Sequence, residues 1–100
     1  MSGILIVTDP DQEKIGLYKI CKTLNSSQTL MALNAARASK DFKIIKFYSC
    51  QDLKKSEEFI KQAIKNKLFT GSTEWVKLDE AGLTKIISTI ETLINIVNDS

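Results

Sequence analysis

The stretch Gly16–Thr23, which reads GLYKICKT, decides the fold that the sequence predicts. Its aromatic and β-branched residues favour a short strand, expected over Ile15–Ile20, that ends in a basic, polar turn. The apolar run Gly3–Thr8 (GILIVT) precedes it and indicates a buried strand. The intervening cluster Thr8–Gln12 contains Pro10 and two aspartates, which are typical turn residues. Because the connection is short, we expect the two strands to pair as an antiparallel hairpin.

The rest of the chain alternates helical and strand patterns, with a candidate helix N-cap in Asn25–Ser27. The expected elements after the hairpin are helix Gln28–Ala38, strand Phe42–Cys50, and a helix that is capped by Gln51–Asp52 and runs towards Leu68. They are followed by a loop over Phe69–Thr73, strand Glu74–Leu78, and helix Glu80–Val97 capped by Asp79. This order predicts one α+β domain over residues 1–100. It has a small antiparallel sheet of three strands plus a short fourth, flanked by three helices.

The composition excludes several kinds of site. The chain has no His, so Ser–His and Cys–His catalysis are excluded. Its two isolated cysteines, Cys21 and Cys50, form neither a metal-ligand pattern nor a disulfide framework, and we expect both to be reduced thiols. The sequence shows no membrane-spanning run of about 20 apolar residues and no signal-peptide pattern. These features predict an intracellular protein, cytoplasmic or nuclear, without a membrane partner.

Charge is unevenly distributed along the chain. Residues 1–70 carry 12 Lys or Arg against seven Asp or Glu, whereas residues 71–100 carry two against five. A basic body fits a nucleic-acid partner, although a lysine-rich composition is equally typical of a well-solvated surface. Thirteen of the 14 basic residues are lysines, which contact phosphates as point charges. A bound nucleic acid would therefore be held by its backbone rather than read by its bases.

Five short segments follow one another in a recognisable order. They are Gly3–Leu5 (GIL), Leu17–Thr23 (LYKICKT), Leu33–Asn34, Glu57 with Ile60 three residues later, and Thr73–Val76 (TEWV). Together they resemble the GIY-YIG superfamily, and within it the small DNA-binding branch of phages and viruses. The resemblance runs from residue 3 to about residue 78 and rests on the order of the segments, since each alone is weak. It implies an antiparallel sheet flanked by helices and, in active members, phosphodiester cleavage with one divalent metal.

The resemblance also implies roles for individual residues. Tyr18 matches the tyrosine of the second motif, Lys22 the lysine after the motif glycine, and Glu57 the glutamate that holds Mg or Mn. A nearby lysine lets a tyrosine accept a proton, because positive charge lowers the phenol pKa. The structural alternative for Glu57 is an ordinary ion pair with Lys61 at i,i+4.

Other positions depart from the family pattern. Leu5 stands where the first-motif tyrosine is expected, Cys21 replaces the motif glycine, and Lys61 falls where many members have a His. The first-helix arginine is missing near Thr29–Met31, and Arg37 lies downstream of its place. Losing one such charge-positioning group costs roughly 10²–10³ in rate. The departures favour a degenerate nuclease-like domain.

Three functions follow from these observations. The first is a DNA-binding module with little or no cleavage and no cofactor, whose phosphate-facing lysines are Lys14, Lys19, Lys22, Lys43 and Lys46. The second is an active Mg- or Mn-dependent endonuclease that uses Glu57 and, in place of the missing arginine, Arg37. The third is a protein-interaction or inhibitor module that keeps only the scaffold. Helix 80–97 would then contact a partner or form a homodimer, unless its apolar stripe simply covers the sheet.

Overall fold

The chain forms a four-stranded antiparallel sheet with the strand order β3-β1-β2-β4. The structure is a computed structural model that describes residues 2–35, 42–68, 71 and 74–99. The strands are β1 (Gly3–Thr8), β2 (Leu17–Thr23), β3 (Lys43–Ser49) and β4 (Trp75–Lys77). The helices are α1 (Pro10–Lys14), α2 (Ser26–Ala35), α3 (Leu53–Ile64), the 3₁₀ turn η1 (Lys65–Lys67) and α4 (Glu80–Asn98). The predicted α+β class, with three longer strands and a short fourth, is confirmed.

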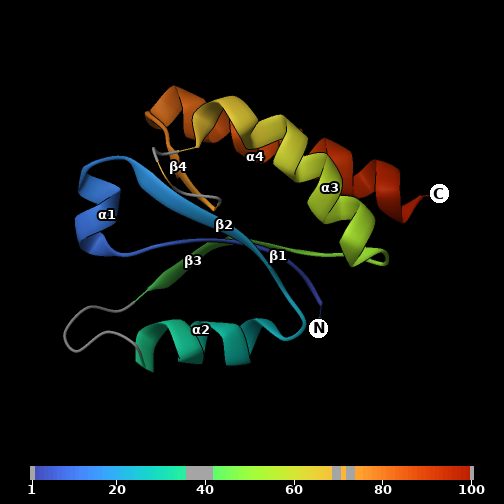
Figure 1. Cartoon of the computed structure of the whole chain (residues 1–100), viewed down its shortest axis with the longest axis horizontal. Helices are drawn as coiled ribbons and strands as arrows, with labels where there is room; N and C mark the ends of the chain where they lie inside the picture. Colours follow the sequence, from blue (N-terminus) through green and yellow to red (C-terminus); the bar gives the residue numbers. More distant parts are fainter. Residues whose placement is uncertain (1, 36–41, 69–70, 72–73, 100) are drawn as a thin grey trace.

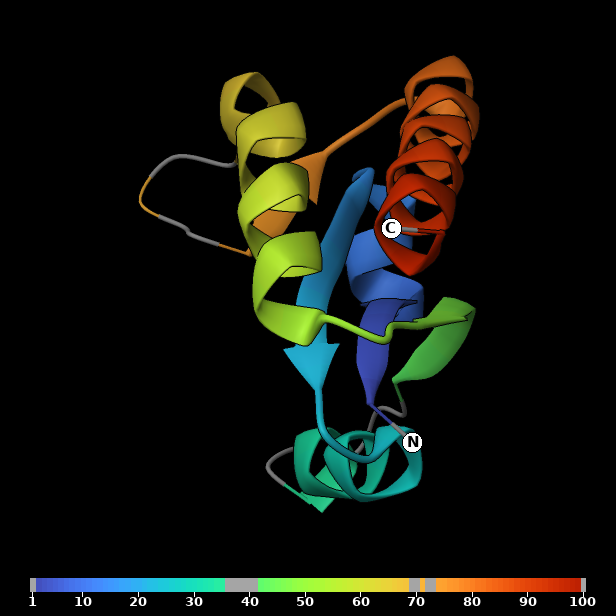
Figure 2. The same ribbon diagram turned by 90° about the vertical axis from the view of Figure 1, so that its right-hand side faces the viewer.

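The helices cover the two faces of the sheet unequally. Helix α2 lies on one face, whereas α3 and α4 lie on the other (Figure 1). Seen from the side, α3 and α4 run next to each other over the strands (Figure 2), and they pack against each other. The face that α3 and α4 cover carries the larger part of the core.

The central strand β1 is buried on both faces. Successive side chains of a strand point to opposite sides. Ile4 and Ile6 therefore pack in the core under α3 and α4, whereas Leu5 and Val7 pack in a smaller core with Leu30 of α2. None of these four β1 side chains reaches solvent appreciably. Burial on both sides explains why β1 is a continuous apolar run rather than an alternating one.

Helix α4 places its apolar stripe on the sheet. Its side chains Ile86, Ile90 and Ile94 recur every four residues and are buried, which is the period of one helix face. Of the two uses predicted for the apolar stripe of this helix, a homodimer contact or a cover for the sheet, the structure shows these three side chains covering the sheet. Over the residues that the structure describes, no helix is both long and apolar enough to cross a membrane.

The first two strands are joined by a helix rather than by a plain turn. The Asp9 side chain accepts a hydrogen bond from the Gln12 backbone N–H at 2.9 Å, and Pro10 occupies the first helical position. Both features begin helices as readily as they make turns, and here they give the one-turn helix α1. The strand β2 also runs on through Thr23 instead of turning after Ile20, because its last residues pair with β1.

Two glycines are required by close backbone contacts. Gly16 adopts a φ of +77°, and a β-carbon there would lie 2.7 Å from the Leu78 carbonyl oxygen. The Leu78 N–H in turn donates to the Gly16 carbonyl at 2.8 Å, which ties the start of β2 to the residue after β4. At Gly3, a β-carbon would collide with the Tyr48 carbonyl and the Phe47 ring. Larger residues at these positions would push strands of the sheet apart.

The two ends of the described chain meet at the β3–α3 connection. The Cys50 N–H donates to the Ser2 carbonyl at 3.2 Å. On the other side, the Asn98 side chain accepts from the Gln51 N–H at 3.0 Å and donates to the Ser49 carbonyl at 3.1 Å. Residues 49–51 therefore hold both the start of β1 and the end of α4.

Truncating the buried face of α4 should destabilise the domain strongly. Ile90 is 0% exposed, so we expect Ile90→Ala to lower the free energy of unfolding by about 2–5 kcal/mol through lost burial and a residual cavity. The matched control is Ile96→Ala on the same helix, where the side chain is 56% exposed and a change within about 0.5 kcal/mol is expected. Urea unfolding measures both. Equal destabilisation by the two variants would contradict the packing of α4 on the sheet.

Candidate functional site

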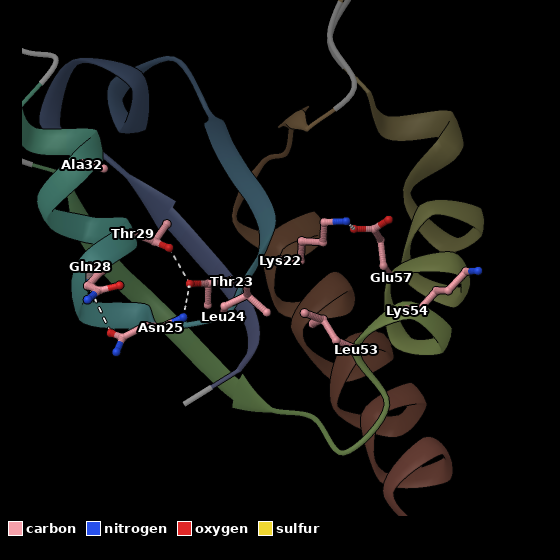
Figure 3. Close-up of a pocket in the computed structure, with 10 residues that line it drawn as sticks. All are labelled: Lys22, Thr23, Leu24, Asn25, Gln28, Thr29, Ala32, Leu53, Lys54 and Glu57. Carbon is pink, nitrogen blue, oxygen red and sulfur yellow. Dashed lines mark hydrogen bonds and ion pairs between the residues drawn. The ribbon is translucent and has the colours of Figure 1, made fainter.

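Two of the residues singled out by the sequence meet between β2 and α3. The Lys22 ammonium lies 3.0 Å from one carboxylate oxygen of Glu57. The other oxygen lies 3.3 Å from the Lys61 ammonium, one turn further along α3. Figure 3 shows Lys22 extending from the end of β2 towards Glu57 on the facing helix. The expected i,i+4 pair and the inter-element pair therefore coexist, and we call these three residues the Lys22–Glu57–Lys61 cluster.

Local structure fixes the position of this cluster. Lys22 follows Ile20 by two residues, so its side chain lies on the sheet face covered by α3 and α4. Helix α3 is held by Asp52, whose side chain caps the Lys55 N–H and whose carbonyl accepts from the Ser56 hydroxyl. With Ser56 and Ile60 turned into the core, Glu57 is left at the edge of the buried stripe.

The two lysines stabilise the ionised form of Glu57. The Glu57 side chain is only 21% exposed. Hydrogen bonding from Lys22 lowers its pKa below the ordinary value of 4.5, Lys61 lowers it further, and partial burial opposes both. The group is thus a carboxylate at neutral pH, neutralised locally by two ammonium groups.

Tyr18 does not join this cluster. It is largely buried in the core and borders a separate hollow with Gly16 and Asp79, at the opposite end of β2. Four residues separate it from Lys22 along the strand, which corresponds to about 13 Å. Among the described residues that line the two clefts beside Glu57, none is a tyrosine.

The positions of the two substituted motif residues explain how the chain tolerates them. Leu5 and Cys21 pair across β1 and β2, and both side chains pack in the smaller core on the α2 side. Position 5 therefore faces away from Glu57. Burial raises the pKa of the Cys21 thiol to about 11, with the Glu74 charge adding to the effect, so this thiol stays protonated at neutral pH.

The cluster as it stands does not fit a divalent metal ion. Magnesium binds through oxygen ligands, commonly one or two carboxylates. Both Glu57 oxygens already accept from ammonium groups, and a metal would have to displace at least one of them.

The five lysines predicted to bind phosphate lie on different parts of the surface. Lys43 is paired with Glu13 at 2.9 Å beside α1, and Lys14 lies at the end of that helix. Lys19 is on the α2 side of the sheet, with its ammonium 6.0 Å from the Trp75 ring centre. Lys46 lies on the edge strand β3, and Lys22 alone is near Glu57. Arg37 falls outside the residues that the structure describes.

A different set of lysines lines the exposed side of α3. Lys54, Lys61 and Lys65 are exposed and lie within about 40° of one another around the helix axis. Lys65 keeps helical backbone angles, with φ −49° and ψ −43°, so the row continues into η1. The spacing i, i+7, i+11 could have shown this row from the sequence alone. We call it the α3 lysine row.

Comparison with known families agrees with this fold. The model of the T5orf172 domain matches residues 3–91. The chain belongs to the T5orf172 domain family. Domains of this family occur in phage, viral and related proteins and have a nuclease-type fold, which makes the chain a nuclease-like module related to nucleic acids. No curated protein and no solved structure matches it. The narrower assignment to the GIY-YIG superfamily stays a prediction.

The Lys22–Glu57–Lys61 cluster should make stability depend on pH. Because the pKa of Glu57 is lowered on folding, its pairing stabilises the fold above pH 4.5 and is lost as the pH falls through the folded-state pKa. We expect Glu57→Gln to cost about 0.5–1 kcal/mol at neutral pH and clearly less at about pH 3.

Urea unfolding of the two proteins at both pH values measures this difference. Glu58→Gln is the control, since Glu58 is exposed and next in the chain, and it should change stability little at either pH. A cost for Glu57→Gln that is the same at both pH values would contradict the pairing.

Proposed function

We propose that this T5orf172 domain binds DNA along the exposed side of α3 and the adjoining end of β2, with little or no cleavage. The observation that carries the proposal is the α3 lysine row beside the Lys22–Glu57–Lys61 cluster. Family membership supports a nucleic-acid partner independently of this surface.

The charges on this side of the molecule favour phosphate contacts. Lys22 and the three lysines of the row lie among three carboxylates: Glu57, which is already paired, Glu74, which lines a cleft with Lys22 and Lys61, and Glu58, which is exposed on the same side of α3 as the row. Four ammonium groups against three carboxylates leave an excess of one positive charge on this surface. The row extends about 16 Å along the helix, long enough to follow several phosphates of one strand. Lysines give backbone contacts without base selection, so the expected binding is weakly sequence-dependent.

Weak or absent cleavage follows from the same cluster. Glu57 carries two ion pairs, and Tyr18 lies at the other end of β2. A phosphoryl-transfer site needs fixed charge and a proton acceptor around the scissile phosphate. The side chains around Glu57 supply the charge, whereas the tyrosine that would accept the proton lies away from them.

Salt-dependent DNA binding tests the proposal. Fluorescence anisotropy with a labelled duplex, between about 50 and 200 mM salt, gives the slope of log K against log salt. We expect the triple variant Lys54→Ala/Lys61→Ala/Lys65→Ala to weaken binding and to reduce this slope by up to about three, roughly one per lysine.

The control is Lys85→Ala, an exposed lysine on α4, which should leave the slope unchanged. A wild-type protein that binds no DNA at low salt would refute the proposal. An unchanged slope for the triple variant would contradict the placement of the DNA-binding surface on α3.

A metal-dependent endonuclease is the second candidate, because Lys22 and Glu57, two residues to which the resemblance gives a catalytic role, lie in contact at 3.0 Å. It requires Glu57 to exchange an ammonium partner for Mg or Mn. Supercoiled plasmid incubated with either metal distinguishes the candidates. We expect no nicking above that given by Glu57→Ala, and nicking that disappears in this variant would favour the endonuclease.

A further inference from the structure

A cleft of about 750 Å³ lies next to the Lys22–Glu57–Lys61 cluster. Helices α2 and α3 cover opposite faces of the sheet, and the cleft passes between them around the end of β2 (Figure 3). Its volume is within the range of natural small-ligand pockets, about 300–1,000 Å³. The function proposed above does not use this space.

The walls of the cleft are mainly apolar. Leu24, in the turn after β2, is 81% exposed and lines the cleft together with Leu53 of α3 and Ala32 of α2. Apolar side chains of this kind contact the flat face of an unstacked base. Leu24 on its own would be an ordinary exposed leucine, but here it lines a hollow to which Leu53 and Ala32 also contribute apolar surface.

Amide groups lie on the α2 side of the same cleft. Asn25 uses its side-chain oxygen to cap the Gln28 N–H at 3.1 Å, and its own N–H donates to the Thr23 hydroxyl at 3.0 Å. The Thr23 hydroxyl also bonds that of Thr29. This network fixes the start of α2, from which the Gln28 side chain borders the cleft. A glutamine amide offers both a donor and an acceptor, as the edge of a nucleobase requires.

Positive charge stands at the opening of the cleft. Lys22 and Lys54 both line it, and Lys54 is also the first member of the α3 lysine row. A DNA strand held by the row would therefore reach the cleft past Lys54. The Glu57 carboxylate also lines the cleft, where its charge is countered by Lys22 and Lys61. The combination of apolar walls, an amide and flanking lysines has the chemistry of a nucleotide site.

We propose that this cleft takes one unpaired nucleotide of a DNA strand whose backbone follows the α3 lysine row. The inference rests on the proposed DNA binding and adds to it a substrate class: DNA with an unpaired nucleotide in preference to a perfect duplex. An unpaired base enters such a site without the cost of unstacking and unpairing, which a perfect duplex has to meet.

Competition between two labelled duplexes tests this inference. One is perfectly paired, and the other carries a single unpaired nucleotide. We expect the wild-type protein to bind the second about fivefold or more tightly, because the perfect duplex must first unstack and unpair a nucleotide. Leu24→Ala should remove this preference while leaving affinity for the perfect duplex unchanged.

Two further variants guard against indirect effects. Ala32→Trp should fill the cleft and also remove the preference, since Ala32 is exposed and its replacement leaves the core untouched. Met31→Ala is the matched control, because Met31 is 70% exposed on the same helix and does not line the cleft. It should keep the full preference.

The outcomes separate the two proposals. Equal affinity for both duplexes, or a preference that survives both Leu24→Ala and Ala32→Trp, would overturn the nucleotide site while leaving DNA binding intact. Binding to neither duplex would overturn the proposed function and this inference with it. Displacement of both duplexes alike by free adenosine monophosphate would assign the cleft to a free nucleotide and would also overturn the inference.

Discussion

The whole domain depends on the burial of β1 between two partner strands and two layers of helices. Both edges of β1 are hydrogen-bonded, to β2 on one side and β3 on the other. Both faces are covered as well, since Ile4 and Ile6 pack against one layer and Leu5 and Val7 against the other. The register of β2 against this strand is specified by the pattern of β2 itself, because a slip of one residue would turn Lys19 towards the larger core in place of Ile20.

The geometry of the Lys22–Glu57–Lys61 cluster is a consequence of that register. Ile4 pairs with Lys22, which places the lysine on the α3 side of β2. The helix is positioned by Ile60 and Ile64 in the same core, so Glu57 comes to lie opposite Lys22. Charged residues at the end of a strand and on a helix edge are thus brought together by apolar contacts further inside.

The sequence allowed the strands, the later helices and their aspartate caps to be predicted, because short-range patterns determine them. Asp52 and Asp79 cap α3 and α4 as expected, and Glu57 lies at the edge of its buried stripe. Helix α1 was not predicted, since Asp9 and Pro10 suit a turn and a helix start equally well. The separation of Tyr18 from Lys22, and the distribution of the lysines over several surfaces, depend on tertiary packing that no local pattern contains.

The junction at residues 49–51 gives the domain a nearly closed backbone circuit. Ser2 and Asn98 both hydrogen-bond to this three-residue segment, so the start of β1 and the end of α4 are anchored at the same place in the fold. Neighbouring ends of this kind are the geometry in which circular permutation and insertion into a host protein are tolerated. A short linker from α4 back to β1 could therefore close the circuit, and new termini could be opened elsewhere with the order of strands in the sheet unchanged.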